Sequence, residues 1–174
     1  MINTIHKVVI SDTTAITYLA KIGALGLLRD LFKIIYIPEA VFHELTRQGD
    51  HVSGSIEVKT LNWIRVKKAE NMNRVNNLFK EKLHLGESEA IGLALQMNAH
   101  LLIMDERDGR KEAISQGLRV TGMLGIFLKA KEQKRVPSVK PYLDKLRLTN
   151  FKMSSQLYVQ VLDQAGENMG AKKA

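Results

Sequence analysis

The chain has 174 residues, of which 45% are hydrophobic and 25% charged. This balance excludes a disordered or fibrous protein and fits a globular domain with its own core. Cysteine is absent, which excludes disulfide bonds, zinc–thiolate sites and thiol nucleophiles. No run approaches the ~20 apolar residues that span a bilayer, and the first residues lack the pattern of a signal peptide. We therefore expect a cytoplasmic protein with no membrane partner.

The formal net charge of +8 is concentrated towards the C-terminal end of the chain. Residues 1–128 are nearly neutral, whereas residues 129–152 hold eight basic residues against Glu132 and Asp144. Such a region suits a polyanionic partner, most commonly nucleic acid, although a solvated basic surface explains the composition equally well. The eight basic residues are Lys129, Lys131, Lys134, Arg135, Lys140, Lys145, Arg147 and Lys152.

The hydrophobic pattern of the first half predicts short strands that alternate with helices. The expected elements are a strand at 7–11, helices at 12–22 and 24–32, a strand at 33–37, and a helix at 39–48 that follows Pro38. The region 50–69 is less regular, because 56–61 fits either a helix or a strand and 63–66 fits a short strand.

The second half continues this alternation. It predicts a helix at 70–83, a break at Gly86, a helix at 87–97, a strand at 99–104, a helix at 110–116, a strand at 118–121, and helices at 123–133, 138–147 and 154–166. Strands separated by helices of this length pair in parallel. The predicted fold class is therefore α/β, a three-layer α/β/α sandwich with a central, mainly parallel sheet. We expect a main domain at 1–150, with a C-terminal helix and tail at 151–174 packed on it or extending from it.

Acidic residues lie at the ends of two predicted strands. Asp12 follows the first strand and Asp105 follows the strand at 99–104, and ligands of parallel sheets bind at the carboxyl ends of the strands. Glu87 begins the helix before that second strand, and Asp108 lies three residues after Asp105. Grouped carboxylates repel one another unless a cation neutralises them. Hard oxygen ligands favour Mg²⁺ or Mn²⁺, so the pattern indicates a divalent-metal site.

Each acid also has a purely structural explanation. Asp12 suits the N-cap of the helix that follows it, and Glu87 suits a first helical turn, where the helix dipole favours acids. Glu44 lies at the edge of a buried helix face, where it could simply be exposed. Asp105 and Asp108 fit caps of the next helix. They also have cations to pair with, namely Arg107, Arg110 and Lys111.

Five short stretches of the chain resemble, in order, the PIN-domain family and in particular its branch of VapC-like toxin ribonucleases. The stretches are VISDTT (9–14), IPEAVFHEL (37–45), LGESEAIGLA (85–94), LIMDERDGR (102–110) and GLRVTGMLG (117–125). Each is weak alone, but five in the family's order over residues 8 to about 130 are specific. The resemblance implies a PIN-like form of the predicted sandwich, with the nuclease domain at 1–150.

The resemblance also implies a set of site residues. The catalytic acids are Asp12, Glu44, Glu87 and Asp105, and these four with Asp108 bind the metal. Thr13 matches a hydroxyl residue beside the site, and Glu87 matches the third acid better than Glu89 by its spacing to the apolar helix. Two positions depart from the toxins, because Ile103 stands where Thr or Ser is common and Gly109-Arg110 replaces an aromatic residue.

By this resemblance, the protein is a divalent-metal-dependent endoribonuclease that hydrolyses RNA phosphodiester bonds, and the toxin of a toxin–antitoxin pair. The implied partners are single-stranded or structured RNA, a small antitoxin and a second copy of the chain. The apolar run 24–32 is a candidate contact between two copies, although a core helix explains it equally well. A catalytically weak PIN-fold module that binds RNA or protein is the alternative. A phosphatase or receiver fits less well, because Thr14 stands where a phosphatase has its second acid and Val120-Thr121 supplies no receiver lysine.

Overall fold

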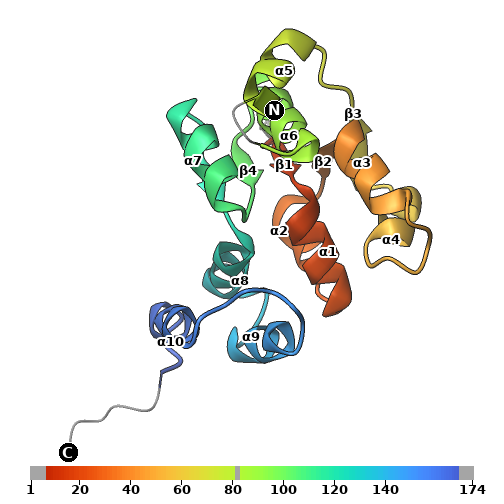
Figure 1. The fold of residues 1–174 in the computed structure, drawn as a ribbon. Coiled ribbons are helices and arrows are strands. Elements are labelled where there is room, and N and C mark those ends of the chain that lie inside the picture. The colour runs from red at the N-terminus through yellow and green to blue at the C-terminus, as the bar shows by residue number, and fades with distance from the viewer. Residues whose placement is uncertain (1–6, 81–82, 169–174) are drawn as a thin grey trace, which may run out of the picture.

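The structure, a computed structural model, describes residues 7–80 and 83–168 (Figure 1). Its centre is a five-stranded sheet in the order β3-β2-β1-β4-β5, in which every pair of neighbours is parallel. The strands are β1 (Val9–Ser11), β2 (Ile35–Pro38), β3 (Ile64–Lys67), β4 (Leu101–Ile103) and β5 (Val120–Thr121). The predicted α/β class with a parallel central sheet is confirmed.

Helices occupy most of the rest of the described chain. They are α1 (Thr13–Lys21), α2 (Gly26–Phe32), α3 (Glu39–Thr46), α4 (Ser55–Thr60), α5 (Met72–Lys80), α6 (Leu85–Gln96), α7 (Arg107–Ser115), α8 (Met123–Glu132), α9 (Lys140–Arg147) and α10 (Ser155–Gln164). Within residues 7–80 and 83–168, none of these helices has the length and apolarity needed to cross a membrane.

Alternate residues of the central strands face two separate cores, as the period-2 geometry of a strand requires. Val9 and Ile103 pack in one core with α1, α2 and α8, whereas Ile10 and Leu102 pack in the other with α5, α6 and α7. Side chains of α9 and α10 extend the first core beyond α8. In Figure 1, α5 and α6 accordingly lie at the end of the molecule opposite to α9 and α10.

Two helices begin earlier than predicted. Helix α6 begins at Leu85, so Gly86 lies inside the helix and the predicted break there is wrong. A Cβ at Gly86 would lie 3.0 Å from Glu44 Oε2 and 3.4 Å from Val41 Cγ2, so this glycine allows α3 and α6 to pack closely. Helix α7 begins at Arg107 instead of residue 110. The end of the predicted helix at 70–83 includes residues 81–82, which lie outside the described residues.

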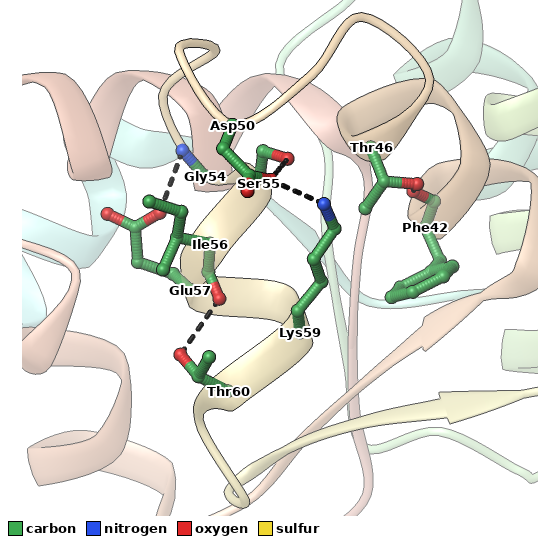
Figure 2. Close-up of polar contacts among 9 residues, drawn as sticks. All are labelled: Phe42, Thr46, Asp50, Gly54, Ser55, Ile56, Glu57, Lys59 and Thr60. Atoms are coloured by element: carbon green, nitrogen blue, oxygen red, sulfur yellow. Dashed lines mark hydrogen bonds and ion pairs between the residues drawn. The ribbon is translucent and has the colours of Figure 1, made fainter.

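The ambiguous segment 56–61 belongs to helix α4, and the tentative strand at 63–66 is the edge strand β3. Figure 2 shows the local contacts that hold α4. Glu57 Oε2 accepts a hydrogen bond from the Gly54 N–H at 3.1 Å, and Asp50 accepts one from Ser55 Oγ at 3.4 Å and pairs with Lys59. These contacts involve side chains three to nine residues apart, and hydrophobic periodicity gives no sign of them.

The segment after α10 is tied to α8 and to the beginning of α9 through Glu167. Its carboxylate accepts hydrogen bonds from Lys131 Nζ at 2.7 Å, Ser138 Oγ at 2.6 Å, and the backbone N–H groups of Val139 at 2.6 Å and Lys140 at 2.9 Å. The described residues after 150 therefore pack on the preceding helices, while the predicted boundary at 150/151 stays a prediction.

We expect Glu167→Gln to destabilise the protein at pH 7 by roughly 1–3 kcal/mol, because hydrogen bonds to a charged group are lost. Although burial raises the pKa of Glu167, the hydrogen bonds from Lys131 and its neighbours lower it from 4.5 to about 2. The stabilisation is therefore present above pH 4.5 and is lost as the pH falls towards 2. Urea unfolding from pH 7 to pH 2 measures this, with the exposed Glu132→Gln on α8 as the control. A constant difference between Glu167→Gln and wild type across that range would contradict the assignment.

Candidate active site

The two predicted strand-end acids lie where the order of the sheet reverses. The chain builds β2 and β3 on one side of β1, and β4 and β5 on the other. Asp12 follows β1 and Asp105 lies two residues after the end of β4, and the Asp12 N–H donates to the Ile103 carbonyl of β4 at 3.0 Å. The carboxyl edge at such a switch point is where open parallel sheets bind their ligands.

A pocket of about 260 Å³ opens at this edge, and we call it the acidic pocket. It brings together three of the predicted acids from three parts of the chain: Asp12 after β1, Glu44 on α3 and Glu87 on α6. The other residues that line it are Thr13, Thr14, His84 and Glu106. Four carboxylates therefore face one small volume, and the described residues that line it include no lysine or arginine.

Each of the three predicted acids is held by a neighbouring donor. Asp12 is 3% exposed and caps α1, since its Oδ1 accepts from the Ala15 N–H at 3.4 Å. Glu44 Oε2 accepts from Thr13 Oγ1 at 2.8 Å. Glu87 is 9% exposed, and its Oε2 accepts from the His84 N–H at 3.1 Å. Asp12 can therefore be both the N-cap of α1 and a site residue, because the capping hydrogen bond positions its carboxylate at the acidic pocket.

Asp105 lies beside the acidic pocket and does not line it. Its Oδ1 accepts a hydrogen bond from the Met123 N–H at 3.0 Å, at the beginning of α8. Its Oδ2 is buried and has no hydrogen-bond partner within the described residues. An unpartnered buried carboxylate oxygen is costly, so this atom marks a place where a cation or a proton is needed.

The raised pKa values of the site carboxyls also indicate that a cation or a proton is needed here. Burial raises the pKa of Asp12 well above 3.8, and the neighbouring charges of Asp105 and Glu87 raise it further. Burial also raises the pKa of Asp105 to about 6, against a hydrogen bond from the Met123 N–H that lowers it. Burial raises the pKa of Glu87 as well. Without a cation the pocket therefore retains protons at pH values where exposed carboxyls have lost them.

Glycines leave room for these carboxylates. A Cβ at Gly122 would lie 2.7 Å from Asp105 Oδ1, and one at Gly109 would lie 3.5 Å from Glu87 Cδ. Neither glycine has a positive φ, so contact with the neighbouring side chains explains them better than backbone freedom. Gly122 and Gly86 therefore lie directly against Asp105 and Glu44, whereas the nearest atom to a Cβ at Gly109 would be Met104 Sδ, at 2.6 Å.

Two further acids named from the sequence lie away from the pocket lining. Glu89 is 9% exposed, and its Oε2 accepts from the Ala40 N–H at 2.9 Å, so it binds the first turn of α3. Asp108 is exposed in the first turn of α7. Its role as a metal ligand stays a prediction.

Sequence reasoning missed two residues that line the acidic pocket, His84 and Glu106. The available signals were local. Glu106 directly follows Asp105 at the strand end, and His84 is the N-cap of the helix that carries Glu87. The signal for Glu106 competed with three other charged residues in the same turn, Arg107, Asp108 and Arg110.

The described acids of the site do not surround a common position for a metal ion. Among residues 7–80 and 83–168, no three acidic or histidine side chains lie close enough together to enclose a metal ion. Glu44 is held by Thr13 and Glu87 by the His84 N–H, so binding an ion would draw these carboxylates away from their present donors. The donor set of carboxylate oxygens is nevertheless the one that Mg²⁺ and Mn²⁺ prefer.

We expect Gly122→Ala to displace Asp105 and to destabilise the protein by roughly 1–3 kcal/mol, because the new methyl group would overlap Oδ1. The backbone at this position, with φ −103° and ψ −179°, accepts alanine without strain, so the effect isolates the contact. Gly26→Ala is the control, since nothing lies within 4 Å of its Cβ position. Thermal unfolding measures both variants, and equal melting temperatures would show that Asp105 is not confined by Gly122.

Comparison with known protein families identifies the chain's relatives. A family model described as DUF3368, a PIN domain, matches residues 8–167, which is nearly the whole described chain. No curated protein matches the chain. PIN domains are generally nucleases and typically use divalent metals, which agrees with carboxylates grouped at the switch point of a parallel sheet. The chain therefore belongs to the PIN-domain family.

Proposed function

We propose that the protein is a divalent-metal-dependent endoribonuclease of the VapC-like toxin branch, which acts in the cytoplasm on RNA and is inhibited by a small antitoxin. The observation that carries the proposal is the acidic pocket, where Asp12, Glu44 and Glu87 meet beside Asp105. Three of these carboxyls have raised pKa values, and burial is the main cause. A site that resists its own ionisation is suited to binding a cation.

In the proposed mechanism, Asp12, Glu44, Glu87 and Asp105 hold one or two Mg²⁺ or Mn²⁺ ions, with Asp108 at the outer edge. Such an ion supplies charge neutralisation and activates water for attack on a phosphodiester. Thr13 positions Glu44 through its hydroxyl group. His84, exposed at the pocket, can donate a hydrogen bond to a phosphate oxygen. Attack of water on phosphorus would break the P–O3′ bond, leaving a 3′-hydroxyl on one RNA fragment and a 5′-phosphate on the other.

The apolar run 24–32, the candidate contact for a homodimer, is partly buried within the protein. In the run 24–32, the side chains of Leu25, Leu27 and Leu28 are buried in the core. A homodimer remains part of the proposal, but it would have to use residues outside these three. The most exposed large apolar side chain in the described chain is Leu148, at 88%.

The alternative is a catalytically weak PIN-fold module that binds RNA or protein. One observation favours this alternative: no three acidic or histidine side chains of the described residues lie close enough to enclose an ion, so these side chains must move before they can hold one. Metal-dependent cleavage distinguishes the two functions, because a binding module would retain RNA without cutting it.

We expect Asp12→Asn to reduce cleavage of single-stranded RNA by at least roughly 100-fold, because a metal-ligating charge is lost. Asparagine can still accept the Ala15 N–H bond as an N-cap, so the fold should be retained. Purified wild type and variant are compared with Mn²⁺, Mg²⁺ and EDTA. Asp30→Asn, a change at an exposed acid paired with Arg29, is the control. Full activity in Asp12→Asn would contradict the assignment of Asp12 as a metal-binding catalytic residue.

We expect Asp105→Asn to be more stable than wild type at pH 7 without metal. The pKa of Asp105 in the folded protein, about 6, exceeds its ordinary value of 3.8. The free energy of unfolding of the wild type therefore falls by up to roughly 3 kcal/mol as the pH rises from the lower to the higher of these values. The difference should vanish below about pH 3, where Asp105 is protonated in both the folded and the unfolded state. Mn²⁺ should raise the melting temperature of wild type at pH 7 and raise that of the variant less. Equal melting curves at every pH, with and without Mn²⁺, would contradict the role of Asp105.

A further inference from the structure

Asp105 separates the acidic pocket from a second hollow in the molecule. A pocket of about 410 Å³ begins at Asp105 and Arg110 and runs between α8 and α10. It adjoins a pocket of about 730 Å³ that reaches Lys129. The two share the lining residues Thr121, Gly125, Leu128 and Gln164, so they are adjacent, and we call them together the α8–α10 groove.

The walls of the groove near Asp105 are mainly apolar. Leu124 and Leu128 come from α8, and Leu157 and Val161 from α10. Phe151, which is half-buried, adds an aromatic ring that is fixed by an edge-to-face contact with Tyr18 at 5.1 Å. Apolar walls with one fixed aromatic ring suit a flat, unpaired nucleobase.

Basic side chains line the groove at both ends. Arg110 and Lys152 lie at the end next to Asp105, and Lys129 lies at the other end. Arg110 is held in place because its Nη1 donates to the Met104 carbonyl at 2.8 Å. Lys131 also lines the groove, but its ammonium group is engaged by Glu167. Basic side chains in this lining outnumber its acids, Asp105 and Glu132, and basic groups along apolar walls suit a phosphate backbone that carries bases.

The groove lies next to the acidic pocket, with Asp105 between them. Asp105 lines the groove, and its charge also raises the pKa of Asp12 in the acidic pocket. Two other aromatic side chains of the chain are engaged elsewhere. Trp63 is 9% exposed, and Tyr142 stacks on Phe127 at 5.4 Å.

We propose that the α8–α10 groove binds the nucleotides of a single-stranded RNA that lie next to the bond cut in the acidic pocket. A base packs against Phe151 and the leucines of the walls, and the phosphates lie on Arg110, Lys152 and Lys129. This inference rests on the proposed ribonuclease function for the identity of the ligand. It adds a subsite formed by α8 and α10, outside the group of acids.

The test measures RNA binding separately from cleavage. In the Asp12→Asn background, a fluorescent single-stranded RNA is titrated and its dissociation constant is read by anisotropy. Two pairs of variants, each with the same change made inside and outside the groove, probe the groove. Gln164→Glu places an acid in it, with Gln156→Glu as the control, and Lys152→Gln removes a cation, with Lys145→Gln as the control.

We expect each groove variant to bind at least about fivefold more weakly, and each control to stay within about twofold of the parent. Phe151→Leu keeps the apolar volume and should also lose about fivefold, because one stacked base is lost. Lys152→Gln should reduce the salt dependence of binding by about one phosphate contact. Melting temperatures confirm that each variant is folded.

The outcomes distinguish this inference from the proposed function. Groove-dependent binding without cleavage by the wild type would support the groove and contradict the nuclease. Metal-dependent cleavage with groove variants that bind like their controls would support the nuclease and overturn the groove. An Asp12→Asn protein that binds no single-stranded RNA would overturn it too.

Discussion

The parallel pairing of β1 with β4 brings Asp12 and Asp105 to one edge of the sheet, and the rest of the site depends on how the protein accommodates these buried charges. Burial opposes ionisation of both. The protein offers them backbone N–H groups and glycines, and the described residues of the acidic pocket include no lysine or arginine. The pocket is thus arranged for an external cation, at a cost in stability that the folded cores must offset.

Helix α8 connects the parts of this account. Its first N–H, from Met123, holds Asp105, its middle forms a wall of the groove, and Lys131 near its end pairs with Glu167. A displacement of either end of α8 should therefore alter the position of Asp105 and the shape of the groove. This arrangement gives the basic C-terminal part of the chain a physical link to the site, beyond its net charge.

Several features could be predicted from the sequence because they follow from local rules. Apolar β-branched runs marked the central strands, and the acids after them had to share an edge once the sheet was parallel. Gly86 was misjudged because its role is contact with Glu44, which lies 42 residues earlier in the chain. The groove was missed for a similar reason. It forms only when α10 packs on α8, and no residue of either helix carries a signal of that contact.

The most direct test of the central claim is a crystal structure of the protein with Mn²⁺, in which anomalous scattering locates the ion. The account predicts an ion at the edge between β1 and β4, with carboxylate oxygens of Asp12 and at least one of Asp105, Glu87 and Glu44 at about 2.0–2.2 Å. It also predicts that Asp105 Oδ2, unpartnered within the described residues, is an ion ligand or receives a bond from a water on the ion. An ion bound elsewhere, or none at saturating Mn²⁺, would contradict the account.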